Sequence, residues 1–172
     1  NFEMSLDEGD HRFASSLYVM LSVDDYVNLD NIDYDVVEQS LINVPYSENY
    51  GMVAVNTLLR ILMAYDHTTN LRLLEIAEKL SCYLLEHADN ISNFINRMQV
   101  IRRKREFTTC EIAEIMKRRT QTSDQDKSAV FYHAGFAALL GNKGDVTFYK
   151  GQMTSEQLEQ YEMFPINNLV VT

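Results

Sequence analysis

The sequence predicts an all-α protein of stacked antiparallel helical hairpins, either a helical-repeat-like array or an irregular bundle, with about seven to nine helices. The 172 residues include only six glycines and two prolines, too few for the many turns of a sandwich or barrel. Apolar residues recur at helical spacing, and no strand-length stretch alternates between apolar and polar residues. Capping boxes mark several helix starts.

The clearest helix start is the capping box of Thr108 and Glu111, in which each side chain accepts a hydrogen bond from the backbone amide of the other. Phe107 and Ile112 stand at the two positions of a hydrophobic staple around it. Further boxes are predicted at Thr154 with Gln157, at Ser5 with Glu8 and, more loosely, at Ser123 with Asp126; Gly141 then ends the helix that begins after Ser123 in the left-handed conformation.

Between these starts, two apolar stripes have helical spacing, and residues 53–65 are apolar nearly all round, as in the central helix of a bundle. Pro165 ends the last helix and leaves an extended tail of Leu169, Val170 and Val171. The two stripes are Leu73, Ile76, Ala77, Leu80, Tyr83 and Leu84, and Ile91, Phe94, Ile95, Met98 and Ile101. We expect helices near 6–22, 33–43, 48–66, 70–88, 91–106, 109–119, 124–140, 144–152 and 155–162.

The length suits one helical domain, 1–172, and the start at Asn1 is consistent with a fragment of a longer protein. Two cysteines, Cys82 and Cys110, are too few for a disulfide scaffold, so we expect a reducing cytoplasm. The apolar runs are too short to span a membrane, and no membrane partner is expected.

Charge is unevenly distributed along the chain. The net charge is −10, whereas residues 97–119 carry +5 and the N-terminal third is acidic. A chain this acidic argues against nucleic acid as the default partner, because phosphate binding needs an electropositive surface. The basic residues of this segment are Arg97, Arg102, Arg103, Lys104, Arg105, Lys117, Arg118 and Arg119.

This basic segment has three interpretations. Four consecutive cations, residues 102–105, cannot share one helix face, so some must approach the core or another helix. The favoured interpretation is structural, with cations at two helix C-termini stabilising the macrodipole and neutralising the acidic third. The second is a surface that binds an acidic partner, and the third is a nucleic-acid surface, against which the cluster offers no interleaved aromatic platform.

Residues 129–153 resemble a tetratricopeptide repeat unit. Phe131 stands at the family's first large aromatic position, Ala134 and Gly135 at its Leu-Gly pair, and Ala138 replaces the next aromatic. With a turn about three residues short, Gly144, Phe148 and Gly151 take the small, aromatic and small positions of the second helix. The physical logic is that small residues let helices approach and the aromatic fills the gap between hairpins. The resemblance implies binding to peptides or proteins.

Arg60 and His67 form an Arg-x6-His pair, seven residues apart on one face of a helix. Small helical ribonucleases of the HEPN family carry a similar motif, and the resemblance implies that Arg60 and His67 act on RNA. Ile61 departs from the polar residue that the family places after the arginine. We also expect Arg60 to be partly buried and held by an acidic or carbonyl partner, whatever its role.

No metal or cofactor is predicted. The four histidines and two cysteines show no His-x3-His or Cys-x-x-Cys spacing, and the turn at 141–144 lacks the features of a phosphate-binding loop. Our first interpretation is therefore a non-enzymatic protein-interaction or regulatory module that binds a protein partner or other domains of the same protein, with homo-oligomers possible. The alternatives are a helical ribonuclease or toxin-like effector using Arg60 and His67, and a nucleic-acid-binding regulator acting through residues 97–119.

Overall fold

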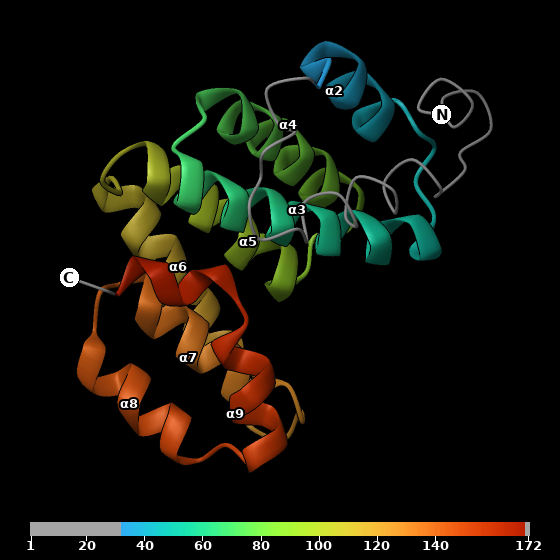
Figure 1. Cartoon of the computed structure of the whole chain (residues 1–172). Helices are drawn as coiled ribbons and strands as arrows, with labels where there is room; N and C mark the ends of the chain where they lie inside the picture. The colour runs from blue at the N-terminus through green and yellow to red at the C-terminus, as the bar shows by residue number, and fades with distance from the viewer. Residues whose placement is uncertain (1–31, 171–172) are drawn as a thin grey trace. The chain divides into compact units, whose positions relative to one another are not determined.

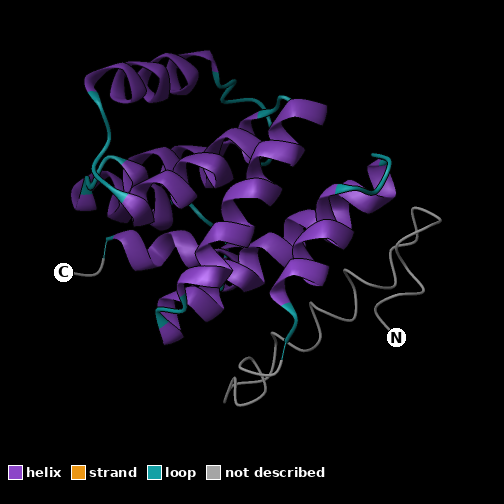
Figure 2. Ribbon diagram, turned by 90° about the horizontal axis from the view of Figure 1, so that it is seen from above, coloured by secondary structure: helices purple, strands orange, loops and turns teal. Residues whose placement is uncertain are grey.

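The computed structural model describes residues 32–170, and over that range its regular elements are all helices, joined by loops and turns (Figure 2). Those residues form eight α-helices and one 3₁₀ helix, which confirms the all-α prediction. The contacts divide the chain into two compact units, Asn1–Asp89 and Asn90–Thr172. Whether both units belong to one cooperative domain stays a prediction. The helix expected at 6–22 and the capping box at Ser5 lie outside the described residues.

In the first unit, α4 is the helix that both of its described neighbours contact (Figure 1). Each helix begins at a side chain that caps its free amides, namely Asp33, Ser47 and Asn70. The six residues predicted as the apolar stripe of α4 are all buried. Within 53–65 of α3, every residue except Asn56 is buried or partly buried. The helices are α2 (Tyr34–Ile42), α3 (Glu48–Thr68) and α4 (Leu71–His87).

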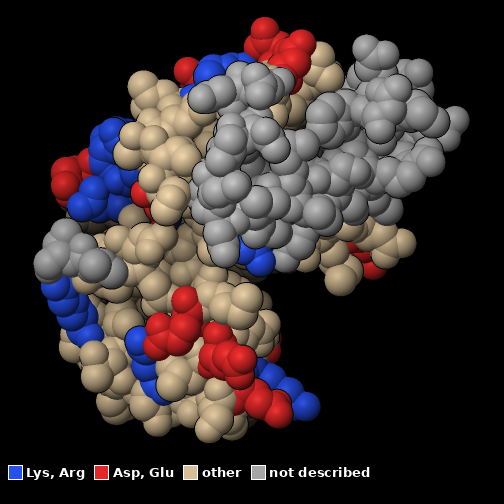
Figure 3. Space-filling model, viewed as in Figure 1, with Lys and Arg blue, Asp and Glu red and all other residues tan. Residues whose placement is uncertain are grey.

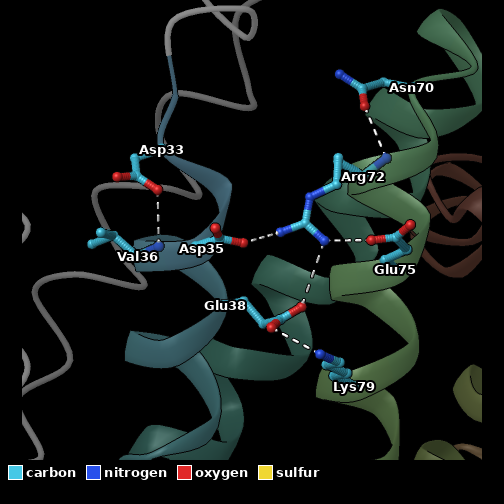
Figure 4. A network of polar contacts seen from close by, with 8 residues as sticks. All are labelled: Asp33, Asp35, Val36, Glu38, Asn70, Arg72, Glu75 and Lys79. Atoms are coloured by element: carbon cyan, nitrogen blue, oxygen red, sulfur yellow. Dashed lines mark hydrogen bonds and ion pairs between the residues drawn. The ribbon is translucent and has the colours of Figure 1, made fainter.

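A charged network joins α2 to α4 (Figure 4). Arg72 of α4 contacts Glu75 and reaches across to Asp35 at 2.8 Å, and Lys79 binds the Glu38 carboxylate at 2.9 Å. Glu38 is only 5% exposed, and its second oxygen lies 4.0 Å from Arg72. A buried carboxylate between two cations is costly to leave unpaired, so the network fixes α2 against α4.

The second unit is organised around α7, which contacts α5, α6, α8 and the 3₁₀ helix η3. Six consecutive residues of α7, 134–139, are buried. Four of these six are alanine or glycine, and small side chains let neighbouring helices approach closely. The elements are α5 (Ile91–Lys104), α6 (Thr109–Gln121), α7 (Ala129–Leu139), α8 (Lys143–Gly151), α9 (Ser155–Glu162) and η3 (Pro165–Leu169).

The predicted start and stop signals of this unit are mostly confirmed. Thr108 with Glu111 and Thr154 with Gln157 both form complete capping boxes. Gly141 has φ +72°, the left-handed conformation that glycine adopts without steric cost. Its amide donates to the Ala138 carbonyl, and the next amide donates to the carbonyl one residue earlier, so α7 ends in a Schellman motif.

The helix expected at 124–140 begins later than predicted, at Ala129. Ser123 does not cap a helix there. Its hydroxyl accepts from the Gln125 amide at 3.3 Å, and Asp126 accepts from the Ser128 amide at 2.8 Å. Such local side-chain bonds offer the backbone an alternative to the helix, so the predicted cap is a pair of turns.

The extended tail was also predicted wrongly for Leu169. Residues Pro165–Leu169 form η3, with proline in its first turn, where a missing amide costs nothing. The side chain of Asn167 secures this helix by donating to the carbonyls of Tyr161 and Phe164, at 2.7 and 3.0 Å. Val171 lies outside the described residues.

The packing expected at the second helix of the 129–153 hairpin is corrected. Phe148 is 60% exposed, so it does not fill a gap between hairpins. A side chain at Gly151 would meet nothing within 4 Å, and at Gly144 only the Asn142 oxygen at 3.6 Å. These glycines are therefore not required by a close approach of helices, whereas Gly135 of α7 is buried.

Candidate functional site

Within the basic segment, Arg103 and Arg105 make contacts inside the second unit. Arg103 turns back to the Gln99 carbonyl at 3.1 Å and reaches the Pro165 carbonyl at 2.9 Å, which ties α5 to η3. Arg105 binds both oxygens of Glu111, at 2.7 and 2.8 Å, across the α5–α6 turn. The Arg105 bonds and the Thr108 amide lower the pKa of Glu111 to about 2. The expectation that some of residues 102–105 approach another element is confirmed.

The second pair, Arg118 and Arg119, anchors α6. Arg118 lies 4.6 Å from the centre of the Phe94 ring, a cation–π contact, and pairs with Glu114 at 3.2 Å. Arg119 pairs with Asp145 of α8 at 3.1 Å. A hydrogen bond to Tyr149 and this ion pair raise the pKa of Arg119.

The remaining cations of the segment are Arg97, Arg102, Lys104 and Lys117. Arg97 is partly buried, whereas Lys104 and Lys117 are exposed. The side chain of Arg102 is 36% exposed and pairs with Glu106 at 3.2 Å. On the face drawn in Figure 3, Lys and Arg atoms form separate groups, and several of these groups lie beside Asp and Glu atoms. All eight basic residues lie in the second unit, and their role in binding a partner stays a prediction.

Helix α6 carries an exposed apolar ridge that the sequence reasoning missed. Ile115 is the one residue of α6 that is fully buried. Ile112 and Met116, one helical turn apart, are 43% and 46% exposed. The spacing of these three residues is typical of a single buried stripe. Ile115 is buried and the other two are exposed because the neighbouring elements pack against only one side of α6.

A pocket of about 170 Å³ adjoins the ridge and shares Ile112 with it. Arg102 and Glu106 add a charged pair to a lining that is otherwise mostly apolar. Its remaining lining residues are Phe107, Ala138, Leu139, Leu140, Gly141 and Leu169.

Arg60 and His67 both lie on α3 in the first unit. Arg60 is partly buried, as expected, and a guanidinium nitrogen lies 3.8 Å from the Met63 sulfur. His67 is exposed in the last turn. Neither residue lines the two pockets described for this protein, both of which belong to the second unit. The ribonuclease hypothesis therefore stays a prediction.

Among residues 32–170, no three His, Cys, Asp or Glu side chains gather closely enough to hold a metal ion. Over the same range, no helix has both the length and the apolar character that crossing a bilayer demands. Comparison with protein families, curated proteins and solved structures finds no match to this chain.

Proposed function

We propose that the chain is a non-enzymatic protein-interaction module whose second unit binds an acidic, amphipathic helical segment of a partner protein. The observation that carries this proposal is the exposed pair Ile112 and Met116 on α6, beside a pocket lined by apolar residues and by the Arg102–Glu106 ion pair. Two large apolar side chains one turn apart match the anchor spacing by which a helix docks on an apolar groove. Exposed apolar residues that adjoin a pocket mark interaction sites more often than isolated ones do.

Charge complementarity favours an acidic partner. The second unit holds 11 Lys and Arg against 9 Asp and Glu, whereas residues 1–89 hold 4 against 16. Lys117 follows Met116 directly on α6, and Arg102 lies at the pocket. Carboxylates on the partner would meet Lys117 and would compete with Glu106 for Arg102, and charges at such a rim act mainly on orientation and association rate.

The first helix of residues 129–153 resembles that of a tetratricopeptide repeat and implies the same class of function, whereas Phe148, Gly144 and Gly151 of the second helix do not pack as that repeat requires. The α7–α8 hairpin of this segment is in place, and its α7 end contributes Ala138, Leu139 and Leu140 to the pocket. A regulatory role, in which the partner is a protein or another domain of the same chain, is consistent with a surface of this kind.

The test is a titration of the full chain with a labelled helical peptide of about 18 residues, carrying leucines at i, i+3 and i+7 among glutamates. We expect saturable binding and chemical-shift changes centred on α6. Ile112→Glu and Met116→Glu should each weaken binding by about tenfold or more, because each removes an apolar anchor and adds repulsion. Met163→Glu is the matched control, since Met163 is 60% exposed in the same unit and lies outside the ridge.

Four results would overturn the proposal. Equal binding of a peptide with lysines in place of glutamates would remove the charge argument. Unchanged binding by Ile112→Glu would place the site elsewhere, and self-association that buries α6 would make a second copy the occupant. Metal-independent RNA cleavage that disappears in a folded His67→Ala variant would favour the ribonuclease instead.

A further inference from the structure

A second pocket of the second unit, of about 360 Å³, lies at the open end of the α7–α8 hairpin, away from the turn at Gly141. Residues near the start of α7 form one wall and the last turn of α8 forms the other, and the connection that precedes α7 completes the rim. The lining residues are Asp124, Asp126, Lys127, Ala129, Val130, His133, Phe148, Tyr149 and Gln152. None of them belongs to the α6 ridge or its pocket.

The aromatic wall of this pocket is held in place from three sides. The His133 ring stacks on Tyr149 with centroids 5.2 Å apart and planes 18° apart. The Nε2 atom of His133 bonds to Asp124 at 2.8 Å, and its side chain is only 12% exposed. Tyr149 in turn bonds to Arg119, which Asp145 anchors. The wall is thus preorganised before any ligand arrives.

Phe148 gives the pocket an accessible aromatic surface. It is 60% exposed and meets Tyr149 edge to face, with centroids 5.2 Å apart and planes 77° apart. A phenylalanine exposed to this degree leaves most of its surface available to a ligand. The negative face of an aromatic ring attracts cations within about 6 Å, and alkylated ammonium groups are bound by aromatic surfaces of this kind.

Two carboxylates complement the ring. The side chain of Asp124 is 89% exposed, and Asp126 is exposed as well. Each uses its Oδ1 atom in an internal bond, Asp124 to His133 and Asp126 to the Ser128 amide. Lys127 is the one cation that opposes them among the nine lining residues. Arg119, behind Tyr149, is neutralised by Asp145.

We propose that this pocket binds an organic cation of the size of a lysine, arginine or methylated ammonium group, with Phe148 facing the cation and Asp126 and Asp124 balancing its charge. The site does not depend on the α6 surface, because the two share no residue. The cation can come from a side chain of a partner or from a free small molecule, and both sources present the same group.

The test is an NMR titration of the full chain with the N-acetyl methylamides of lysine, trimethyllysine and the uncharged analogue norleucine. We expect saturable shifts at Phe148, Tyr149 and Gln152, and binding of trimethyllysine about tenfold tighter than that of norleucine. A second titration uses free tetramethylammonium. If it binds as tightly as the trimethyllysine derivative, a free small cation is sufficient to occupy the pocket.

Two variants keep the test sharp. Phe148→Leu retains an apolar side chain without the aromatic face and should weaken trimethyllysine binding about tenfold. Asp126→Asn keeps an oxygen that accepts from the Ser128 amide but removes the charge. It should weaken binding of the cations and leave binding of norleucine unchanged. Met163→Leu, outside the pocket, is the control. Equal shifts with norleucine, or full binding by Phe148→Leu, would overturn the proposal.

Discussion

In each unit, one helix contacts most of the other described helices, and these two central helices are built differently. Helix α4 buries one face with large side chains, among them Leu80 and Leu84 at 0% and 1% exposure. Helix α7 is buried all round through 134–139, and four of those six residues are alanine or glycine. The first helix fills space with its own side chains, whereas the second brings its backbone close to its neighbours.

This difference predicts opposite sensitivities. Removing volume from α4 leaves a cavity that its neighbours cannot fill, whereas adding volume to α7 forces its neighbours apart. Helix α6 is a third case, because it buries only Ile115 fully and depends on the polar contacts of its arginines.

The largest effect is expected for Leu80→Ala, which should lower the free energy of unfolding by about 2–5 kcal/mol because a fully buried leucine is replaced by a cavity. Urea unfolding measures it. Leu71→Ala in the same helix is the control, since Leu71 is 67% exposed, and it should change little. Equal losses in both variants would contradict the one-sided packing of α4. A single shifted transition reported by amides of both units would support one cooperative domain.

Ala137→Leu in α7 should cost about 1–3 kcal/mol through overpacking, because Ala137 is 0% exposed. The same substitution at Ala113, which is exposed on α6, is the control and adds no strain. Thermal unfolding compares the two. If Ala137→Leu stabilised the protein, unfilled space would exist around α7, and the proposed difference in packing between α7 and α4 would be wrong.

The two capping boxes of the second unit differ in charge, and this difference predicts a pH effect. Thr108→Ala should cost about 0.5–2 kcal/mol by removing a cap. Glu111 has a folded pKa of about 2, below its ordinary value of 4.5, because Arg105 and the Thr108 amide bond to its carboxylate. A depressed pKa gives stability that is present above about 4.5 and lost as pH falls toward about 2.

Glu111→Gln isolates that contribution, because glutamine keeps the box, as Gln157 does in α9. After correction for intrinsic exchange rates, opening of the first turn of α6 should depend less on pH between about 4.5 and 2 in the variant, whereas the box at Thr154 uses Gln157, which does not titrate. An α6 exchange profile that keeps the same acid dependence in Glu111→Gln would assign it to another group.

The smallest effects are expected at two buried tyrosines, Tyr50 and Tyr161, each 1% exposed. The Tyr50 hydroxyl donates to the Leu41 carbonyl, so Tyr50→Phe should cost about 0.5–1.5 kcal/mol. The Tyr161 hydroxyl has no partner among the described residues, and burial raises the pKa of Tyr161 to about 12. Tyr161→Phe should therefore be neutral or stabilising. Calorimetry compares the stability of the two variants with that of the parent protein. Equal losses of stability in both would indicate a water bound at the Tyr161 hydroxyl.

Local signals allowed the sequence to predict most helices. Capping residues such as Thr108 and Thr154 act within one turn, so their consequences are visible in a short stretch of chain. The start of α7 was misplaced because Ser123 and Asp126 serve equally well in turns and in caps. Nothing local distinguishes the two uses.

The candidate sites were less predictable. Lysines and arginines in a run suggested a binding surface, yet Arg103, Arg105, Arg118 and Arg119 make contacts inside the unit. Which of them do so depends on residues up to 62 positions away in the chain. Ile112 was assigned to a staple, and its exposure follows only from where neighbouring elements pack. The pocket at Phe148 combines three segments, so no single motif encodes it.

The weak apolar anchoring of α6 has a kinetic consequence. Ion pairs with partly exposed side chains weaken as salt rises, whereas buried apolar contacts do not. Helix α6 should therefore open locally more often than α7, and increasingly so at high ionic strength, which is observable as faster amide exchange. A partner that binds only the closed helix would suppress this opening in proportion to its occupancy. Recognition and local ordering would then be thermodynamically linked in one helix.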